Sequence, residues 1–509
     1  MLEHLSQLAS VIFSKKMEKA KESTSETTLR HPLLLSKLKK PPKSKYAFAS
    51  AMIASMASLL AGYNIGVMSG AQIFMKDDLK ISDVQVEILA GSVHIYSLVG
   101  SLTAGWTSDC IGRRNTLLVT SIIYLLGLLI TCAANNYFWL MVGRFVTGIA
   151  IGYMVVVRIY VAEVSPAATR GFLTALPEVA INAGLLFGYV SNFAFAYLPV
   201  RLSWRIMFVV ASVPPILLGF GTFSLPESLR WLVMKGQLGK AREVLTQISG
   251  SPEEAEAQLI EIKEKAGITR EDTEVVSTQN YSQDKNIWTE LIVTPTPVVC
   301  RIIITVLALH FLEQASGIDA VVLYSPRIFE KAGMTTTKDL LGATIIVGLT
   351  KTALIVVPML LSDRVGRRPL LLSSTAGMAA SLIMLSLVLQ MVGDFVIAPT
   401  WIVAVCIMAV LSYVGFFSAG LGPITMAYSS ETIPLKLRAQ GMGLAIAVNR
   451  LVCGVVAMTF ISIYEEISIS CTFYIYAVII GFAFVFVYFC LPETRGKSLE
   501  EIEVLFGKK

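Results

Sequence analysis

Twelve long apolar stretches constrain this chain more than any other feature of its sequence. Each is long enough for a helix to cross the hydrocarbon core of a bilayer, which takes about 20 apolar residues. Lipid offers no hydrogen-bond partners, so each stretch must satisfy its own backbone, as a helix does. We therefore predict twelve transmembrane helices, over residues 46–70, 85–107, 116–134, 138–161, 172–198, 204–225, 300–325, 340–361, 369–392, 399–428, 439–463 and 472–491.

The composition excludes most soluble classes of protein. Only 15% of the 509 residues are charged and 54% are hydrophobic, whereas soluble domains carry about a quarter charged residues. The net charge of +6 comes from basic residues in short loops and at the chain ends, which indicates membrane topology and not nucleic acid binding. The chain has no HExxH or GxSxG motif, no phosphate-binding loop and no CxxC pattern. We expect no enzymatic activity, metal site or cofactor.

A charged, helix-prone segment divides the apolar stretches into two groups of six. It contains "EEAEAQLIEIKEK", which is typical of an amphipathic helix outside the bilayer. We predict an all-α membrane protein with five parts: an N-terminal tail (1–44), a six-helix half (45–225), a linker with amphipathic helices (226–299), a second six-helix half (300–491) and a C-terminal tail (492–509).

The distribution of Lys and Arg predicts the orientation of the chain. Basic residues gather in the N-terminal tail, in "KLKKPPKSK", and in the loops after the second and eighth helices, on the side of the linker. Because cytoplasmic loops carry the excess of Lys and Arg, we expect both termini and the linker in the cytoplasm.

The two halves repeat each other. "GWTSDCIGRR" (105–114) corresponds to "LLSDRVGRR" (360–368), and similar acid–Arg pairs follow the fourth and sixth helices of each half, offset by about 250 to 270 residues. These residues could simply anchor helix ends, but their repetition favours ion networks that gate movement of the two halves. The predicted network residues are Asp109, Arg113, Arg114, Glu163, Arg170, Glu227, Asp363, Arg367, Arg368, Glu431, Arg438 and Glu493. Two parallel six-helix repeats are a transporter architecture, with substrate bound between the halves.

Longer motifs resemble one family closely. They include "PESLRWLVMKG" (226–236), "QASGIDAVVLYSP" (314–326), "GLGPITMAYSSETIP" (420–434) and "PETRGKSLEEIE" (492–503). With them the chain resembles a sugar porter of the major facilitator superfamily from about residue 45 to residue 505, and "PEVAINAGLLFGYVSN" (177–192) is similar to plant polyol/monosaccharide transporters. The resemblance implies proton symport of polyols or monosaccharides by a monomer in the plasma membrane; the vacuolar membrane remains open.

The resemblance also implies a substrate site. Its positions here are Glu178, Glu313, Gln314, Asp319, Asn449 and Met426. Amides and carboxylates at this depth suit a ligand rich in hydroxyls, and charged groups within a membrane usually mark a functional site. On a continuous helix, Asp319 would point about 120° away from Glu313. We therefore expect Gly317 to interrupt the helix.

The chain departs from the family at the position of proton coupling. Asn64 stands where proton-coupled members have Asp, opposite an Arg that corresponds to Arg144. An amide cannot titrate, so Asn64 removes the proton carrier expected there. Glu313, Met426, Arg158 and His94 are further departures, where the family has Gln, Trp, Pro and an uncharged residue.

Three functions remain open from the sequence. Another carboxylate could carry the proton in a symporter: Glu313 is the first candidate, and Glu178 and Asp319 are the others. Alternatively, Glu313 could only neutralise the charge of Arg158 or Arg144. Without a carrier, the chain would be a facilitator of the same substrates. A third possibility is a sugar sensor that binds substrate without transporting it.

Overall fold

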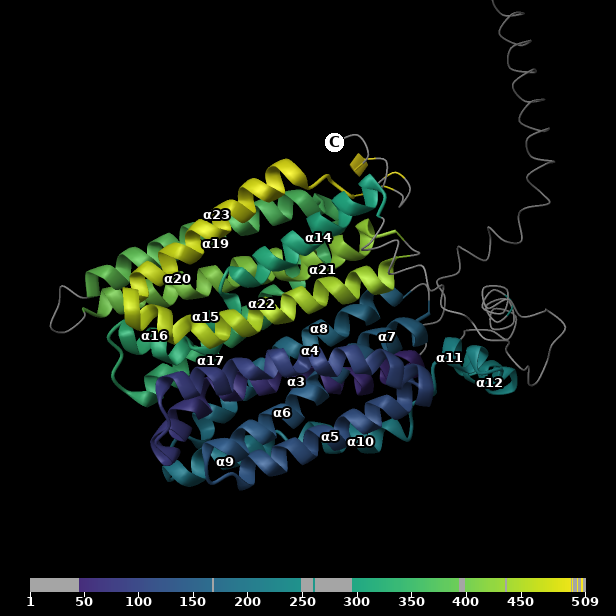
Figure 1. Cartoon of the computed structure of the whole chain (residues 1–509), viewed down its shortest axis with the longest axis horizontal. Helices are drawn as coiled ribbons and strands as arrows, with labels where there is room; N and C mark the ends of the chain where they lie inside the picture. Colours follow the sequence, from purple (N-terminus) through teal and green to yellow (C-terminus); the bar gives the residue numbers. More distant parts are fainter. Residues whose placement is uncertain are drawn as a thin grey trace, which may run out of the picture.

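The computed structural model describes residues 45–166, 169–248, 295–392, 399–434 and 437–495, together with residues 260, 497, 501, 505 and 506. The tail 1–44, most of the predicted linker and most of the C-terminal tail lie outside these residues. Figure 1 shows a bundle of helices that run side by side along the long axis of the molecule.

Twelve membrane-spanning helices occur in the described part of the chain, as predicted. Several consist of two shorter helices in line. The first half contains α3 (Lys45–Leu79), α4 (Asp83–Ile111), α5 (Arg113–Ala133), α6 (Tyr137–Tyr153) with α7 (Val155–Val164), α8 (Arg170–Phe195), and α9 (Val200–Val210) with α10 (Val213–Thr222). The second half contains α14 (Pro297–Ala315) with α15 (Ile318–Leu323), α16 (Ser325–Lys331), α17 (Thr337–Leu354) with α18 (Val356–Val365), α19 (Arg367–Val392), α20 (Thr400–Ala419) with α21 (Leu421–Thr432), α22 (Arg438–Ile467) and α23 (Ile469–Cys490). Two short helices, α11 (Leu229–Met234) and α12 (Leu238–Ile248), begin the linker.

The interruption expected at Gly317 is present between α14 and α15. Gly317 has a φ of +84°, a backbone conformation that side chains with a Cβ rarely adopt. A Cβ at this position would also lie 2.7 Å from the ring of Tyr476. The break turns Asp319 onto a new helix, so it no longer follows the helical register of Glu313.

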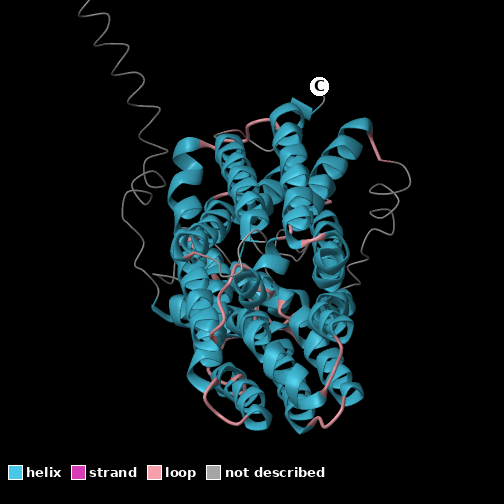
Figure 2. Ribbon diagram, turned by 90° about the vertical axis from the view of Figure 1, so that its left-hand side faces the viewer, coloured by secondary structure: helices cyan, strands magenta, loops and turns pink. Residues whose placement is uncertain are grey.

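The duplication read from the sequence is visible in the packing. In the first half α3 packs on α8 and α5 packs on α6 and α10; in the second half α14 packs on α22 and α19 packs on α20 and α23. These are the same pairs by position in each half: first with fifth, third with fourth, and third with sixth. Figure 2 shows the two groups of helices as an upper and a lower bundle.

Several helix pairs join the halves, and two of them make the broadest contacts. They are α4 with α22 and α8 with α17, which correspond to each other under the repeat. Small residues allow close approach, as is usual between membrane helices: a Cβ on Gly454 would meet the side chain of Ile95, and one on Gly348 would meet the ring of Tyr189 at 2.7 Å.

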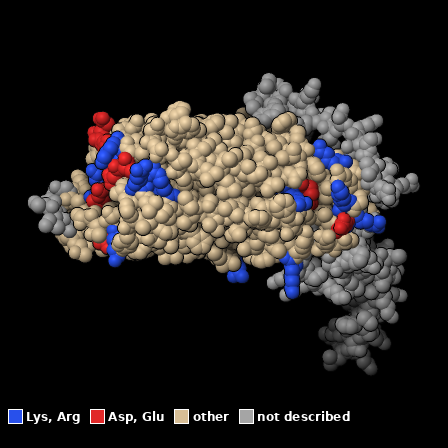
Figure 3. All heavy atoms as spheres, turned by 90° about the horizontal axis from the view of Figure 1, so that it is seen from below, with Lys and Arg blue, Asp and Glu red and all other residues tan. Residues whose placement is uncertain are grey.

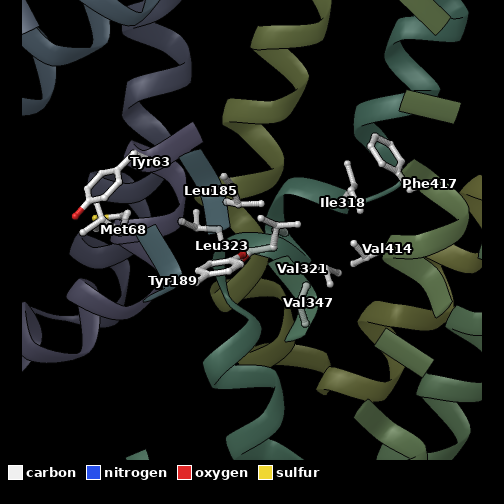
Figure 4. Packing of buried hydrophobic residues seen from close by; sticks show 14 of the residues in the cluster. Tyr63, Met68, Leu185, Tyr189, Ile318, Val321, Leu323, Val347, Val414 and Phe417 are labelled. Carbon is white, nitrogen blue, oxygen red and sulfur yellow. The ribbon is translucent and has the colours of Figure 1, made fainter. Parts of the chain in front are cut away.

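Buried apolar side chains continue across this interface. Tyr63, Met68, Leu185 and Tyr189 come from the first half, and Leu323, Val321 and Val347 from the second (Figure 4). The Tyr189 hydroxyl donates to the Val322 carbonyl at 2.6 Å, so its polar end is satisfied within the core.

The outer surface suits a bilayer. Charged side chains gather towards the two ends of the long axis, and the surface between them is mostly uncharged (Figure 3). Large apolar side chains lie on the outside of the helices; Leu102, Trp106 and Phe220 are 72–74% exposed. In water such a surface would be unfavourable, whereas lipid tails cover it at no cost.

Candidate functional site

A cavity of about 100 Å³ lies between the two halves. Its lining residues on α3 and on α4 lie about midway along these two helices. Three of its residues, His94, Arg158 and Arg450, are ionisable, and three are serines. The lining consists of Ser58, Ala61, Ile65, Val93, His94, Ser97, Ser101, Ile151, Gly152, Met154, Val155, Arg158, Ile181, Met426, Ile446 and Arg450.

Only one of the six predicted substrate residues, Met426, belongs to this lining. A second, Glu178 on α8, lies beside it, because its carboxylate accepts a hydrogen bond from Arg158 Nη2 at 2.9 Å. Arg158 is thus paired with Glu178 and not with Glu313, which corrects one of the alternatives drawn from the sequence.

Glu313 forms a buried cluster with groups from neighbouring helices. Its Oε2 accepts a hydrogen bond from Asn449 Nδ2 at 3.2 Å and lies 3.4 Å from His310 Nδ1. His310 Nε2 lies 3.2 Å from the Ser429 hydroxyl on α21. All four side chains are less than 9% exposed. Two of the predicted residues, Glu313 and Asn449, are therefore together.

Asp319 and Gln314 make different contacts. Asp319 Oδ2 accepts a hydrogen bond from the Cys453 thiol at 2.7 Å, on α22. Gln314 Oε1 is buried and accepts no hydrogen bond within the described part of the chain. Asp319 and Gln314 are thus outside the Glu313 cluster, although Cys453, the partner of Asp319, lies one turn after Asn449 on α22.

Asn64 and Arg144 are in contact, as expected from the sequence. Arg144 Nη1 donates to Asn64 Oδ1 at 2.9 Å, and its remaining bonds go to the backbone oxygens of Leu89 and Ala90. Asn64 Nδ2 donates to the Tyr124 hydroxyl at 3.4 Å. Asn64 and Arg144 are 1% and 2% exposed. A guanidinium is thus held in the core of the first half by neutral oxygens, with no carboxylate at the position of Asn64.

The network of the first half surrounds the start of α5. The Glu227 carboxylate accepts hydrogen bonds from the backbone N–H groups of Arg113 and Arg114, at 2.8 and 3.1 Å. A carboxylate at a helix N-terminus satisfies free N–H groups and favours the helix dipole. The Arg113 side chain then reaches Asp109 at 2.8 Å and Glu163 at 3.2 Å. Together these bonds tie α4, α5, α7 and the segment before α11.

The second half builds the same network at the start of α19. Glu493 accepts from the backbone N–H groups of Arg367 and Arg368, both at 3.0 Å. The Arg367 side chain reaches Glu431 at 2.8 Å, and the Thr494 hydroxyl also donates to Glu431. Each helix is preceded by a glycine with positive φ, Gly112 or Gly366. A Cβ there would collide with the capping glutamate, at 2.7 Å in the case of Gly366.

These networks modify the interpretation from the sequence in two ways. The bonds described above each join residues of the same half, so in this conformation they stabilise the halves separately. Arg438 donates to the Ile433 carbonyl at 3.4 Å and not to Glu431. The side chains of Arg170 and Asp363 lie outside what the structure describes.

The halves are bonded to each other at the opposite end of the molecule. Asp83, at the start of α4, accepts hydrogen bonds from Arg327 on α16 and from Lys76 on α3, both at 2.7 Å. Burial by itself lowers the pKa of Arg327, but its bonds to Asp83 and Tyr464 outweigh this effect and raise the pKa. One turn along α4, Glu87 accepts from the backbone N–H groups of Ile461 and Ser462 and from the Ser462 hydroxyl. These bonds close this end of the interface between the halves.

Sequence reasoning did not identify several of these residues. Arg450 follows Asn449 directly, and an Arg within an apolar stretch was a signal that could have been used. Asp83 and Arg327 stood in regions expected to be loops, where a pairing across 244 positions leaves no local pattern. The sequence did not single out His310 either, because its place in the cluster depends on its contact with Glu313, one turn later on α14.

Comparisons with known proteins agree with this architecture. The family model described as "Sugar (and other) transporter" matches residues 50–506. "Polyol transporter 5" of Arabidopsis thaliana is 49% identical over 473 residues, which cover 92% of this chain and 88% of the relative. "Glucose transporter GlcP" of Staphylococcus epidermidis is 31% identical, covering 89% and 95%.

Solved structures show the same fold. The inward open conformation of the xylose transporter XylE from E. coli has a TM-score of 0.74 at 24% identity, covering 90% of this chain and 100% of that chain. The proton:xylose symporter XylE bound to 6-bromo-6-deoxy-D-glucose has a TM-score of 0.73, covering 91% and 100%.

Proposed function

Because the chain belongs to the family of sugar (and other) transporters, we propose that it moves polyols or monosaccharides across a membrane by alternating access. The observation that carries this proposal is the cavity between the halves, midway along α3 and α4, combined with the contacts of Asp83 and Glu87 that join the halves at one end. Alternating access needs a site between the halves and contacts that hold the halves together on one side at a time.

The chemistry of the cavity suits a ligand with many hydroxyls. The hydroxyls of Ser97 and Ser101 donate to backbone oxygens of α4 and can still accept from a ligand. Ser58 offers a further hydroxyl in the lining, and the Glu178–Arg158 pair adds a charged donor and acceptor beside it. Gln314 Oε1, buried without a partner among the described residues, and the Glu313–Asn449 pair would be further ligands if the cavity deepens during the cycle.

Asn64 makes a facilitator the function that fits best. Proton coupling needs a group that binds a proton on one side and releases it on the other, and an amide does neither. Arg144 is already satisfied by neutral oxygens, so it does not require a carboxylate at position 64. The protein would then equilibrate its substrate without accumulating it.

A symporter is the second candidate, and the Glu313 cluster favours it. Glu313 is a buried carboxylate 3.4 Å from the His310 imidazole, and a carboxylate, unlike an amide, can bind a proton and release it. In this case Glu313→Gln would abolish accumulation of substrate while leaving its equilibration.

Uptake into cells that lack their own transporters tests both candidates. Labelled sorbitol, xylitol, inositol and glucose are supplied with and without a protonophore, to the natural chain and to Asn64→Asp. One proton driven by about 100 mV corresponds to roughly 50-fold accumulation. For a facilitator, we expect the natural chain to reach the outside concentration and Asn64→Asp to exceed it, unless the protonophore is present.

The control variant is Asn135→Asp, an exposed amide at the end of α5 remote from the cavity. It should behave as the natural chain. Accumulation by the natural chain, abolished by the protonophore, would replace the facilitator by the symporter. If neither form takes up any of these compounds although both reach the membrane, transport is refuted, and a sugar sensor is the remaining function.

The gating role of the two networks follows from the same proposal. When the cavity opens towards the other side, the two halves must approach each other at the ends that carry Arg113 and Arg367. The networks would then bond across the halves, and the Asp83–Arg327 bond would break.

The protein is a multi-pass integral membrane protein. The positive charges on the linker side support cytoplasmic termini and a cytoplasmic linker. The likeness to plant polyol transporters supports the plasma membrane and a monomer. A fluorescent fusion, viewed beside plasma-membrane and vacuolar markers, tests the location.

A further inference from the structure

Asn182 on α8 carries a buried hydrogen-bond acceptor that lacks a donor. Its side chain is 2% exposed, and its Oδ1 receives no hydrogen bond from any residue that the structure describes. An unpaired polar atom in a protein interior costs free energy, and native structures keep few of them. The side-chain oxygen of Asn182 therefore calls for a partner from outside the described part of the chain.

The other end of the amide fixes its orientation. Asn182 Nδ2 donates to the backbone oxygen of Glu178, one turn earlier, at 2.9 Å. If the amide were turned over, its oxygen would face that carbonyl, and two acceptors repel each other. The free atom is therefore the oxygen, and its missing partner must be a donor.

Asn182 lies at the edge of the cavity, where the two halves meet. Its neighbour Ile181 belongs to the lining. Glu178, one turn earlier on the same face of α8, is bonded to the lining residue Arg158. From the second half, the Thr352 hydroxyl on α17 donates to the backbone oxygen of Asn182 at 3.0 Å. Separation of α8 from α17 would therefore open a path from the cavity to the Asn182 side chain.

A second asparagine on α8 offers a direct contrast. Asn192 is 1% exposed, its Nδ2 donates to the Gly66 carbonyl at 2.8 Å, and its Oδ1 also lacks a donor among the described residues. Its side chain packs on α3, where a Cβ on Gly70 would lie 2.5 Å from it. Because α3 and α8 belong to the same half, this contact does not part when the halves move. Asn182 differs from Asn192 in its place beside the cavity.

A hydroxyl of the substrate is the donor that suits Asn182. An anion would be repelled by the amide oxygen, and a hydroxyl donates one hydrogen without bringing a charge. Side chains four residues apart on a helix are about 5–6 Å apart at Cβ, so a polyol that bonds to Glu178 with one hydroxyl can reach Asn182 with another. In the second half, Gln314 Oε1 has the same need of a donor.

We propose that Asn182 determines the substrate specificity of this cavity by accepting a hydrogen bond from one hydroxyl of a polyol that Glu178 holds by another. The inference rests on the proposed transport function and adds a residue to its substrate site. It predicts that one particular hydroxyl of the substrate is required as a donor. A compound with fluorine in place of that hydroxyl would leave Asn182 Oδ1 unpaired.

The test uses the purified full-length protein in liposomes. Exchange of labelled sorbitol is inhibited with sorbitol and with a set of analogues in which fluorine replaces one hydroxyl at a time, which removes the donor. A lost hydrogen bond to a buried amide corresponds to a roughly tenfold loss of affinity. In the natural chain, at least one analogue should therefore inhibit about tenfold more weakly than sorbitol.

Asn182→Leu should remove this difference at one position of the analogue set and leave the others. Sorbitol and that one analogue should then inhibit equally, because neither finds an acceptor. Asn182→Ala, which also lacks the acceptor, serves the same comparison. The ratio of the two inhibitors is measured within each variant, so it does not depend on how much protein folds. Asn192→Leu is the matched control and should keep every difference.

The proposal is overturned if every difference between sorbitol and its analogues survives in Asn182→Leu and Asn182→Ala, since a water molecule would then be the partner of Asn182. It is also overturned if Asn192→Leu removes the same difference. If no form exchanges sorbitol, the proposed transport function fails. The shift of the unfolding temperature by sorbitol relative to its analogues then decides the present inference separately: a larger shift with sorbitol, lost in Asn182→Leu, supports it, and equal shifts refute it.

Discussion

The bond between Asp83 and Arg327 is expected to hold the closed end of the molecule shut. It joins α4 of one half to α16 of the other at 2.7 Å, and Lys76 binds the same carboxylate. Asp83→Asn keeps the size of the side chain and one oxygen acceptor but removes the charge. Both cations then lose their anion at once.

The size of the expected shift follows from the burial of the Asp83–Arg327 pair. The Arg327 side chain is 12% exposed and that of Asp83 27%, so the pair is shielded more than a surface ion pair, which contributes less than 1 kcal/mol. Hydrogen bonds to charged groups contribute about 1.5–3 kcal/mol. We take the lower end, about 1.5 kcal/mol, because the amide retains one bond. This corresponds to a roughly tenfold shift of the conformational equilibrium away from the state described here.

Distances between spin labels measure this shift. Labels at positions 197 and 338, both exposed, lie at the closed ends of α8 and α17 in different halves. They are introduced after the seven native cysteines have been replaced. In Asp83→Asn the population with the longer distance should rise about tenfold, and transport should become slower in the direction that depends on closing this end.

Asp339→Asn is the matched control. Asp339 is an exposed acid at the start of α17, on the same end of the molecule, and its substitution should leave the distances unchanged. Identical distance distributions in the natural chain and in Asp83→Asn would refute the reasoning, because the ion pair would then contribute nothing to closure.

Two further substitutions probe the network and the cavity. Gly366→Ala places a Cβ at a φ of +107°, 2.7 Å from Glu493. The backbone strain costs about 1–3 kcal/mol, so the unfolding temperature in detergent should fall. Gly481→Ala is the control, because its Cβ meets open space, and it should not lower the unfolding temperature. An equal effect of both would contradict the capping geometry. Met426→Trp restores an aromatic face in the cavity lining, and at about 0.5–1.5 kcal/mol it should tighten binding of ring sugars two- to tenfold in a competition assay. Met408→Trp, on an exposed position of α20, should have no effect, and a similar gain there would refute a role for stacking.

Periodic and repeated features of the chain were predictable from the sequence. The twelve spans follow from apolar length alone, and the three repeated motifs predicted a duplication that the packing of α3 on α8 and of α14 on α22 reproduces. The break at Gly317 was predictable as well, because glycine is the residue that permits a positive φ. Span ends were less accurate: the first helix extends to Leu79 and the tenth to Thr432, since polar residues at helix ends do not stop a helix that packs on its neighbours.

The pairing of charged residues was only partly predictable. Asn64 and Arg144 were paired by resemblance, and they are in contact. For Glu313 the sequence offered the wrong partners, because Arg158 is captured by Glu178 and Arg144 by neutral oxygens. Which acid meets which base inside a bundle depends on helix rotation to within a few tens of degrees, and a hydropathy pattern does not fix rotation that closely.

The two capping glutamates have a consequence for how this molecule is assembled. Glu227 comes after the sixth span and returns to the start of the third, and Glu493 does the same in the second half. Each six-helix unit is therefore fastened by its own tail and needs nothing from the other unit to complete its loops. Each half is thus built like a separate subunit, and the single polypeptide links the two. A rearrangement at their mutual interface, formed largely by α4 with α22 and α8 with α17, would therefore leave both capping networks intact.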